Sequence, residues 1–447
     1  MEQNALPAET DTLIVGGGQA GLAASEHLSR RGIAHIVLER ARIAESWRSM
    51  RWDSLVMNGP AWHDRFPSLA FDCPPDAFPG KDEVARYMER YAQKIAAPIH
   101  CGIDVQRAAP VPGHNHFQVD TSQGQILARS VIAATGPFQT PIIPPILPAD
   151  AGPQQIHSSQ YRNPDQLAPG AVLVVGAGSS GAQIAQELAA AGRQVYLSVG
   201  AHDRPPRRYR GRDFVWWLGV LGKWNADTPA PGTAHVTIAV SGTEGGHTVD
   251  FRRMAHSGVV LVGMTEAYRD GRITFAGDLA ENIAQGDANY LSVLDQADAY
   301  IAAHGLDLPP EPEARILPPD PDCLRHPIRA LDLHQAGIAT VIWATGFRQD
   351  FSWLQADTFD DLGRPQHQRG VGRVPGVYFL GLPWLTRRGS AFIWGVWHDA
   401  KFIADQIAIQ RGYDAYSGTA APVHPYAPVR HWHWPAPRCA EIAKDPL

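Results

Sequence analysis

Cysteine is scarce in this sequence: 447 residues contain four, at positions 73, 101, 323 and 439. No two of them form a CxxC pair, the spacing on which redox-active dithiols and many zinc sites depend. The sequence therefore disfavours disulfide reduction and a zinc site. We expect separate, buried thiols and no bound metal.

Long apolar runs and an excess of one charge are missing as well. No segment approaches the roughly 18 uninterrupted apolar residues that a membrane-spanning helix needs. The first residues, MEQNALPAETDT, lack the basic start and apolar core of a secretion signal. A formal net charge of -6 does not favour nucleic acid or an anionic membrane as a partner. We expect a cytoplasmic protein that binds neither.

Glycine, by contrast, occurs in two matching arrangements. In the first, Gly16, Gly18 and Gly21 follow a short apolar stretch and precede a helix-like one, and the next apolar stretch ends in Glu39. In such a unit the glycines let the backbone approach a pyrophosphate, the helix N-terminus attracts its charge, and the acid binds a ribose. GxGxxG alone is weak evidence, but the complete unit predicts a dinucleotide site.

The second arrangement stands far enough from the first to belong to another folding unit. Gly176, Gly178 and Gly181 again follow an apolar stretch, and Ser179 and Ser180 stand between the last two glycines, where a helix should begin. All five residues are predicted to contact a second dinucleotide.

The two units differ in charge. Ser198 stands in the second unit where the first has Glu39, and an arginine-rich stretch follows it. A small residue with arginines suits the 2′-phosphate of NADP, and Arg207 and Arg208 are our candidates for it. For most of the arginines in the stretch a solvated loop is the simpler expectation. The pair of units thus predicts FAD first and NADPH second, with NADH as an alternative and hydride passing from nicotinamide to flavin.

Four further stretches carry a family resemblance. They are ERARIAESWRSMRWDSLVMNGP from residue 39, two apolar strands that end in ATG (131–136 and 341–346), and GSAFIWGVWHDAKFIADQI from residue 389. Together with the glycine units, over about residues 11–411, the chain resembles the class B flavin-dependent monooxygenases, which include the flavin-containing monooxygenases and the plant YUCCA enzymes.

This resemblance implies roles for individual residues. Trp47 and Arg48 are expected near the flavin, and Asn58 is the candidate catalytic residue, a polar side chain beside the isoalloxazine that would form hydrogen bonds there. An ordinary loop amide is the competing interpretation of Asn58. Four residues of the ATG strands are expected where the chain passes close to a dinucleotide, namely Thr135, Gly136, Thr345 and Gly346.

The stretch IHSSQYRNP, residues 156–164, resembles part of the family's FxGxxxHxxxY fingerprint. His157 and Tyr161 match, whereas Ala151 and Pro153 stand at the positions of the Phe and the Gly. The resemblance places His157 and Tyr161 in the linker between the two domains, near the cleft that both cofactors share. We favour a hinge role there over a catalytic one. Tyr161 also disfavours the Baeyer–Villiger group, which has Trp at that position.

The fold class predicted is α/β, with two Rossmann-like dinucleotide-binding domains in which an NADPH domain is inserted into an FAD domain. The expected segments are 1–160 for the first part of the FAD domain, 165–325 for the NAD(P)H domain, 326–411 for the rest of the FAD domain, and 412–447 as a C-terminal extension. Within the NAD(P)H domain, RPPRRYRGRDFVWWLGVLGKW predicts an inserted helix that packs on the domain, with a membrane-surface helix as the alternative.

The function implied is a monooxygenase. NADPH would reduce FAD, the reduced flavin would form a C4a-hydroperoxide with O2, and one oxygen atom would pass to a small organic substrate while the other leaves as water. A flavin NAD(P)H oxidase or reductase without oxygen transfer, and a sensor that binds dinucleotides without turnover, are the alternatives. The sequence does not identify the substrate, and a homodimer is compatible with such folds.

Overall fold

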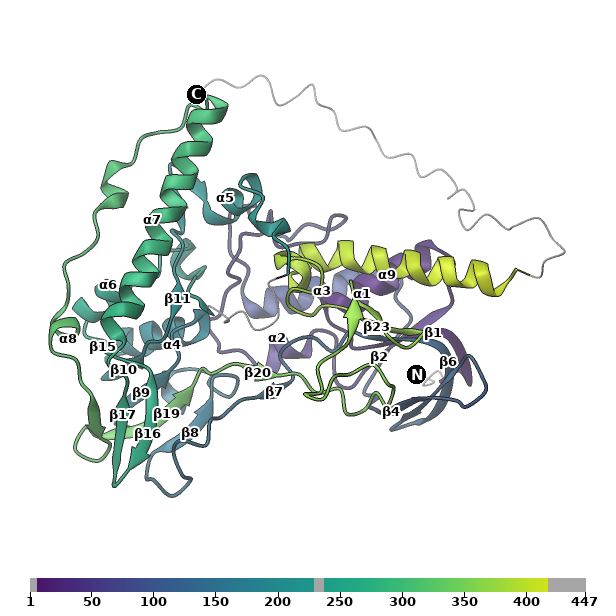
Figure 1. Cartoon of the computed structure of the whole chain (residues 1–447), viewed down its shortest axis with the longest axis horizontal. Coiled ribbons are helices and arrows are strands. Elements are labelled where there is room, and N and C mark those ends of the chain that lie inside the picture. The colour runs from purple at the N-terminus through teal and green to yellow at the C-terminus, as the bar shows by residue number, and fades with distance from the viewer. Residues whose placement is uncertain (1–5, 229–236, 417–447) are drawn as a thin grey trace.

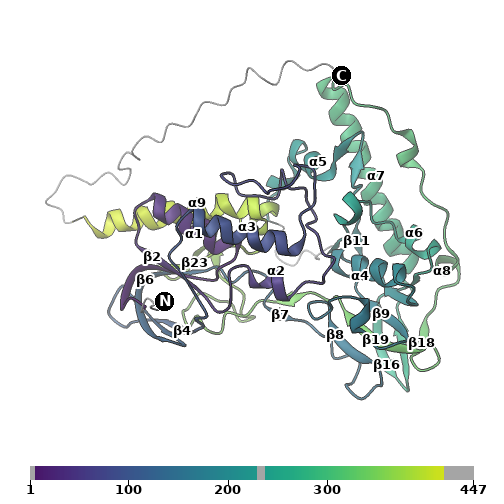
Figure 2. The same cartoon turned by 180° about the vertical axis from the view of Figure 1, so that it is seen from behind.

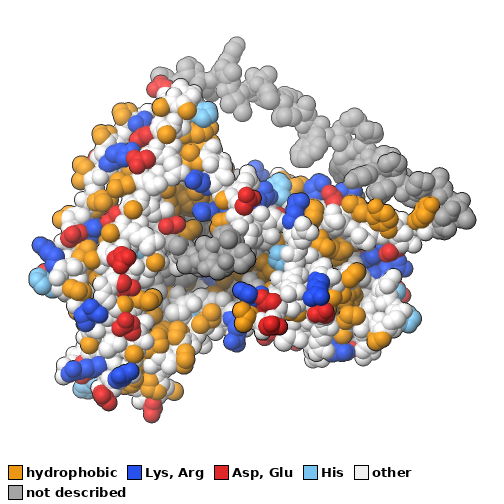
Figure 3. All heavy atoms as spheres, viewed as in Figure 1, with side chains coloured by type: hydrophobic (Ala, Val, Ile, Leu, Met, Phe, Trp, Pro, Cys, Tyr) orange, Lys and Arg blue, Asp and Glu red, His pale blue; other side chains and the backbone are white. Residues whose placement is uncertain are grey.

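The computed structural model describes residues 6–228 and 237–416, which form two α/β domains that lie side by side (Figure 1). Each domain contains one of the two glycine units. Acidic and basic side chains are interspersed on the face shown in Figure 3. No helix among the described residues is long and apolar enough to cross a membrane. Most of the expected C-terminal extension, residues 417–447, lies outside the described residues.

The first domain is built on a nine-stranded sheet. Its main path runs β21-β22-β23-β6-β1-β2-β3, and β1 pairs in parallel with both β2 and β6. The strands are β1 (Glu9–Val15), β2 (His35–Glu39), β3 (Ile99–Cys101), β4 (Val105–Pro110), β5 (Phe117–Thr121), β6 (Gly124–Ala133), β21 (His367–Gln368), β22 (Val371–Gly372) and β23 (Val377–Phe379). Three helices cover one face of this sheet (Figure 2), namely α1 (Gln19–Arg30), α3 (Lys81–Lys94) and α9 (Ile393–Asp414).

The second domain contains a five-stranded parallel sheet in the order β15-β10-β9-β19-β8. Its strands are β8 (Gln154–His157), β9 (Ala171–Val175), β10 (Val195–Ser198), β15 (Val260–Val262) and β19 (Ile338–Trp343). A small antiparallel sheet joins it, with strands β16 (Thr265–Arg269), β17 (Arg272–Phe275) and β18 (Ala330–Asp332). The helices are α4 (Ser179–Ala190), α5 (Phe214–Val220), α6 (Phe251–His256), α7 (Leu279–His304) and α8 (Asp322–Arg325).

The remaining elements are short. They comprise α2 (Glu45–Ser49), β7 (Thr140–Pro141), β11 (His202–Asp203), β12 (Arg208–Tyr209), β13 (Arg212–Asp213), β14 (Thr237–Ile238), β20 (Phe347–Arg348) and the 3-10 turns Pro164–Gln166, Lys223–Asn225, Thr243–Gly245, Pro312–Arg315 and Arg388–Ala391. In Figures 1 and 2, α2, β7 and β20 lie between the two domains.

Strand pairing moves the domain crossings away from the expected positions. β8 precedes residue 160 and β19 follows residue 326, yet both pair within the sheet of the second domain. The chain therefore enters the second domain between β7 and β8 and leaves it between β19 and β20. β7 and β20 pair antiparallel with each other, so the two crossing strands lie next to one another. The expected boundaries at residues 160–165 and 325–326 are therefore wrong. They followed the spacing of the motifs, which does not show that the second ATG strand, β19, pairs between β9 and β8 in the second sheet.

The apolar side chains of α3 recur at helical spacing, and Val84, Tyr87, Met88 and Tyr91 are all fully buried in the core of the first domain. The inserted helix also has the expected place, because Trp217 of α5 is fully buried and belongs to the same apolar cluster as residues of α7. The arrangement favours packing on the second domain over a membrane-surface helix.

Candidate functional site

The first glycine loop leaves the start of α1 open. Gly16 has a φ of +115°, and a Cβ there would lie 2.5 Å from the carbonyl oxygen of Ala134. A Cβ on Gly21 would overlap the carbonyl oxygen of Gly16, whereas one on Gly18 would meet no atom within 4 Å. Close packing therefore requires two of the glycines, while the third faces the space into which a pyrophosphate would fit.

Glu39 lies beside this loop, at the end of β2. Its Oε2 accepts a 2.7 Å hydrogen bond from the amide of Gly17, and its Oε1 accepts a 2.9 Å bond from the amide of Ala41. The carboxylate is thus held next to the glycine loop, where an acid that binds a ribose is expected. The open helix start and the adjacent acid fit a dinucleotide such as FAD.

The second glycine loop repeats this packing. Gly176 has a φ of +106°, a Cβ there would lie 2.6 Å from the carbonyl oxygen of Ala344, and a Cβ on Gly181 would overlap the carbonyl of Gly176. Ala134 and Ala344 are the alanines of the two ATG motifs. Each ATG strand therefore closes the glycine loop of its own domain, which explains why the two motifs occur in pairs.

The start of α4, unlike that of α1, is covered by the chain itself. The side chain of Thr237 lies where a Cβ on Gly178 would be. Ser179 Oγ donates a 2.9 Å hydrogen bond to the carbonyl of Ile238 and accepts a 3.2 Å bond from the amide of Val240. We call residues 237–240 the covering segment. A pyrophosphate at this helix start would have to displace Thr237, so this site fits a dinucleotide only after the segment shifts.

The polar residues expected around a 2′-phosphate divide into buried and exposed ones. Ser198 is 2% exposed, and its Oγ donates to the carbonyl of Gly263 and accepts from the amide of Thr265, so it joins β10 to neighbouring chain. Arg207 is 3% exposed. Arg208 is exposed, and its guanidinium donates a 2.7 Å hydrogen bond to the carbonyl of Gly245.

Arg207 requires a correction. Its guanidinium binds Asp213 through Nε and Nη2, and Nη1 donates to the carbonyls of Asn58 and Ser241. It also lies between the rings of Phe78 and Phe214, at 4.6 and 4.7 Å. Protein groups use all of its donors, which leaves none for a phosphate. Arg208 is the member of the predicted pair that stays available.

The four ATG residues lie between the two domains. Gln139 donates a 2.9 Å hydrogen bond to Thr135 Oγ1 and a 2.8 Å bond to the carbonyl of Gly136. Thr345 Oγ1 donates to the carbonyl of Ile142. Gly136 and Gly346 have φ values of +74° and +83°, a conformation that favours glycine. The ends of both ATG strands are therefore tied to the β7–β20 crossing.

His157 is held as a neutral ring at this crossing. The amide of Ser159 donates to its Nδ1, so Nε2 carries the proton and donates a 2.9 Å hydrogen bond to the carbonyl of Gly346. Burial, and the positive charge of Arg51, lower the pKa of His157. Its contacts are to Ser159, just after β8, and to the second ATG motif. The predicted linker position of His157 and Tyr161 is wrong, because β8 already pairs within the second domain's sheet and both residues therefore lie inside that domain, while the hinge role stays a prediction.

Tyr161 ties the segment between β8 and β9 to α4. It is fully buried, and its hydroxyl donates a 2.7 Å hydrogen bond to Glu187, whose other oxygen accepts from Ser54 at 2.6 Å. Glu187 thus binds this segment of the second domain and a loop of the first domain at once. It is Glu187, through Ser54, that connects the domains here.

The residues after the first glycine unit lie at the boundary between the domains. Trp47, on α2, packs against the cores of both domains. Arg48 forms a 2.6 Å ion pair with Glu89. Arg51 lies 4.9 Å from the ring of Phe138 and 5.8 Å from that of Trp47, and burial lowers its pKa to about 10. Among the described residues Arg51 forms no ion pair, and the sequence did not single it out.

Asn58 faces the second domain. Its Oδ1 accepts a 2.9 Å hydrogen bond from Nε2 of Gln183, on the first turns of α4, and its carbonyl accepts a 2.6 Å bond from Arg207. The candidate catalytic residue is therefore held by two side chains of the other domain. Sequence analysis missed Gln183, and its only signal was a polar residue two positions after the last glycine of the second unit.

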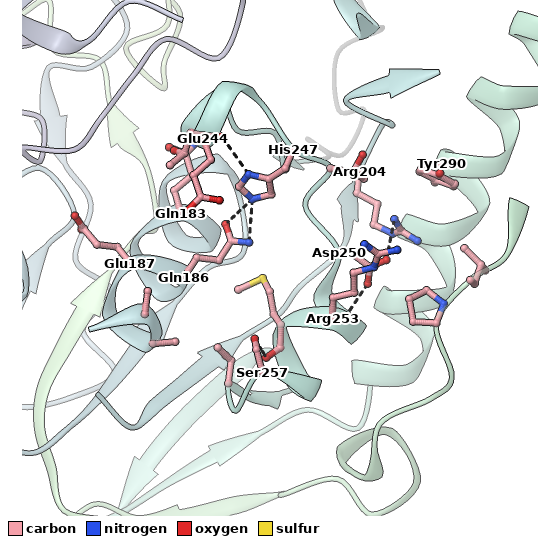
Figure 4. Close-up of a pocket in the computed structure, with 18 of the residues that line it drawn as sticks. Gln183, Gln186, Glu187, Arg204, Glu244, His247, Asp250, Arg253, Ser257 and Tyr290 are labelled. Carbon is pink, nitrogen blue, oxygen red and sulfur yellow. Dashed lines mark hydrogen bonds and ion pairs between the residues drawn. The ribbon is translucent and has the colours of Figure 1, made fainter. Parts of the chain in front are cut away.

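A cavity of about 770 Å³ lies along the other side of α4 (Figure 4). It is bounded by α4, α6 and residues 313–318, and Gln186 contacts His247 on its wall at 3.2 Å. None of the predicted cofactor residues lines this cavity. The predicted cofactor residues thus lie outside this cavity.

Known proteins with this organisation are oxidoreductases. A family model described as pyridine nucleotide-disulphide oxidoreductase matches residues 13–213. The chain is 37% identical over 404 residues to an uncharacterized CzcO-like oxidoreductase of Geobacillus kaustophilus, covering 89% of this chain and 98% of the relative. It is 27% identical to indole-3-pyruvate monooxygenase YUCCA1 of Oryza sativa subsp. japonica, over 89% of this chain and 91% of that one.

Solved structures agree in fold. The flavin-containing monooxygenase from Stenotrophomonas maltophilia superposes with a TM-score of 0.63 at 22% identity, covering 91% of this chain and all of the other. The bacillithiol disulfide reductase from Staphylococcus aureus gives a TM-score of 0.58 at 13% identity, with 91% of this chain and all of that one covered. Fold, site and relatives together define a flavin-dependent monooxygenase of class B. Within this class the chain belongs to the family of the CzcO-like oxidoreductases.

Proposed function

We propose that this enzyme uses NADPH and O2 to insert one oxygen atom into a small organic substrate, with FAD bound in the first domain. The observation that carries the proposal is the pair of glycine loops, each closed by the alanine carbonyl of an ATG strand, with Asn58 at the contact between their domains. Two dinucleotide-binding domains that contact each other at Asn58 suit the transfer of hydride from nicotinamide to flavin.

In this proposal the chain supplies binding and orientation, and bound FAD supplies hydride acceptance and O2 activation. The open start of α1 would hold the FAD pyrophosphate, and Glu39 its ribose. At the second loop, displacement of Thr237 would expose the start of α4 to the pyrophosphate of NADPH. Arg208, the exposed arginine of the predicted pair, would then pair with the 2′-phosphate.

Asn58 is the proposed catalytic residue. Its Oδ1 is taken by Gln183, so its Nδ2 is the group that remains to donate a hydrogen bond toward the flavin. Trp47 and the crossing strands β7 and β20 would help to exclude water from the same space, which limits wasteful loss of the activated oxygen as peroxide. Arg51 adds an unpaired positive charge to this region.

Thiol chemistry is poorly supported. Burial raises the pKa of Cys73 to about 11 and also raises the pKa values of Cys101 and Cys323. Thiols held protonated are weak nucleophiles, and these three are not joined in disulfides. This disfavours disulfide reduction, although the matching family model carries that name.

The test is to purify the enzyme, identify its flavin, reduce it anaerobically with NADPH or NADH, and then mix it with O2. The proposal predicts bound FAD, faster reduction by NADPH, and a transient absorbance after O2 that NADP+ prolongs. Immediate return to oxidised flavin with one peroxide per NADPH would instead identify an oxidase. No reduction by either nicotinamide would identify a sensor.

A further inference from the structure

The side chain of Gln183 is almost fully buried, at 6% exposure, and makes contacts in two directions. Its Nε2 donates a 2.9 Å hydrogen bond to Oδ1 of Asn58 and a 2.7 Å bond to the carbonyl of Val240. Its Oε1 is buried without a hydrogen-bond partner among the described residues. Leaving such an acceptor unpaired is unfavourable, so stability alone does not explain the choice of an amide here.

These contacts determine which way both amides point. A main-chain carbonyl can only accept, so the NH2 group of Gln183, and not its oxygen, must face Val240. The second hydrogen of that NH2 group then points at Asn58 and requires the oxygen of Asn58 to face α4. The NH2 group of Asn58 is consequently directed away from Gln183 as a donor. The assignment follows from the hydrogen-bond network, as it must for amides.

The backbone at Asn58 is held from the same side. Arg207 donates to the carbonyl of Asn58, and Arg207 is itself fixed by Asp213 at 2.6 Å. A Cβ on Gly242, just beyond the covering segment, would overlap the carbonyl of Met57. Residues 57–58 therefore have little freedom to move while the domains are in contact, and the amide torsion of Asn58 is left to Gln183.

We propose that Gln183 is a positioning residue of the oxygenation reaction, which fixes the Asn58 amide with its NH2 group as a donor toward the flavin. This inference rests on the proposed function. The same Gln183 nitrogen holds Val240 of the covering segment, which a bound nicotinamide dinucleotide must displace at Thr237. The orientation of Asn58 in the first domain is thereby linked to occupancy of the dinucleotide site in the second.

Gln183→Glu tests the orientation at nearly constant shape. A glutamate cannot donate two hydrogen bonds from this position, and it offers Asn58 an acceptor, so the NH2 group of Asn58 should turn toward α4. We expect NADPH-driven peroxide release without substrate to rise at least about tenfold, because removal of one preorganised donor commonly costs 10²- to 10³-fold. Asn58→Leu should have a similar effect, and the double variant should be no worse than either single one.

Gln186→Glu is the matched control, one helical turn further on, where the side chain contacts His247 and not Asn58. The readout that does not depend on turnover is the near-UV and visible circular dichroism of the oxidised flavin. It should change in the same way in Gln183→Glu and Asn58→Leu, and should not change in Gln186→Glu. FAD content and melting temperature show whether each variant is folded, and Gln183→Met replaces Gln183→Glu if the latter loses FAD.

The inference is overturned if Gln183→Glu matches Gln186→Glu in both readouts, or if the effects of Gln183→Glu and Asn58→Leu multiply in the double variant. Failure of the proposed function gives a different pattern, in which the wild-type enzyme forms no transient species with O2. In that case the circular dichroism comparison still decides whether Gln183 fixes the orientation of the Asn58 amide.

Discussion

The hydroxyl of Tyr161 donates a 2.7 Å hydrogen bond to Glu187, and this bond attaches the segment between β8 and β9 to the helix of the second dinucleotide unit. Tyr161 is fully buried, whereas Glu187 is half-buried and lines the cavity beside α4. Through Ser54, the same carboxylate also holds a loop of the first domain. One acidic side chain thus joins three parts of the chain that meet between the domains.

Tyr161→Phe should reduce the stability of the protein without changing the shape of the segment between β8 and β9. Loss of a buried hydrogen bond to a charged group, with Glu187 left partly unsatisfied, should lower the free energy of unfolding by about 1–3 kcal/mol. Urea denaturation measures it. The matched control is Ser54→Ala, which removes the other bond to Glu187 from an exposed side chain and should cost less. Equal losses of unfolding free energy in the two variants would show that burial of the donor side chain does not strengthen its bond to Glu187.

Substitution of two glycines of the first loop should affect different properties, folding in one case and FAD binding in the other. Gly21→Ala places a Cβ against the carbonyl of Gly16 and should prevent stable folding. Gly18→Ala meets no protein atom within 4 Å and has a φ of -89°, so the variant should fold normally. Its methyl group would occupy the expected pyrophosphate space, and FAD affinity should fall at least about tenfold. FAD titration of the apoprotein measures this, and an unchanged affinity would place the pyrophosphate elsewhere.

Arg207 and Arg208 should differ although they are neighbours. Arg208→Ala should weaken NADPH binding by about tenfold and spare NADH, because it removes a charge that is proposed to face the 2′-phosphate. Arg207→Ala should instead lower stability, since it removes the only ion pair of Asp213 among the described residues and leaves this half-buried carboxylate with the Val215 amide. Equilibrium binding of both nucleotides, with melting temperatures, distinguishes the two. Selective loss of NADPH affinity in a stable Arg207→Ala variant would reverse the assignment.

Thr237→Ala tests the covering segment. The substitution removes the methyl group that lies at Gly178 and so should ease displacement of the segment by a pyrophosphate. We expect a lower Kd for both NADPH and NADH, because both carry the pyrophosphate that Thr237 would obstruct at Gly178. Thr243→Ala, three positions after the end of the covering segment, is the control. A Kd unchanged from wild type would show that the segment does not compete with the dinucleotide.

His27 makes stability depend on pH. Burial, and the charge of Arg30, lower the pKa of His27 to about 3, whereas in the unfolded chain it has its ordinary value of 6.5. The folded state thus binds fewer protons, and its stability is complete above pH 6.5 and is lost as the pH falls toward 3, by up to about 1.4 kcal/mol per pH unit. His27→Gln should flatten the curve of unfolding free energy against pH between 6.5 and 4. If the slope of unfolding free energy against pH does not change in this variant, groups other than His27 cause the pH dependence.

Much of this organisation was predictable because local patterns carry it. Both glycine units show their glycine spacing, helix starts and strand ends within about thirty residues, and the buried stripe of α3 follows from its helical period. The acid at Glu39 was placed by the same short-range logic, since it ends the strand next to the loop. Where backbone geometry over one βαβ unit decides the structure, the sequence alone determined it.

Tertiary structure decided what connects the units. Asn58 and Gln183 are 125 positions apart, and nothing local to either indicates that they meet. Arg207 and Arg208 are both arginines and adjacent, yet Arg207, in the bend before β12, is buried against Asp213, while Arg208, the first residue of β12, is exposed. The second ATG strand reads like the first, but only sheet pairing showed that it belongs to the other domain. The sequence by itself determined two dinucleotide-binding units, and the contacts between distant side chains determined how they form one site.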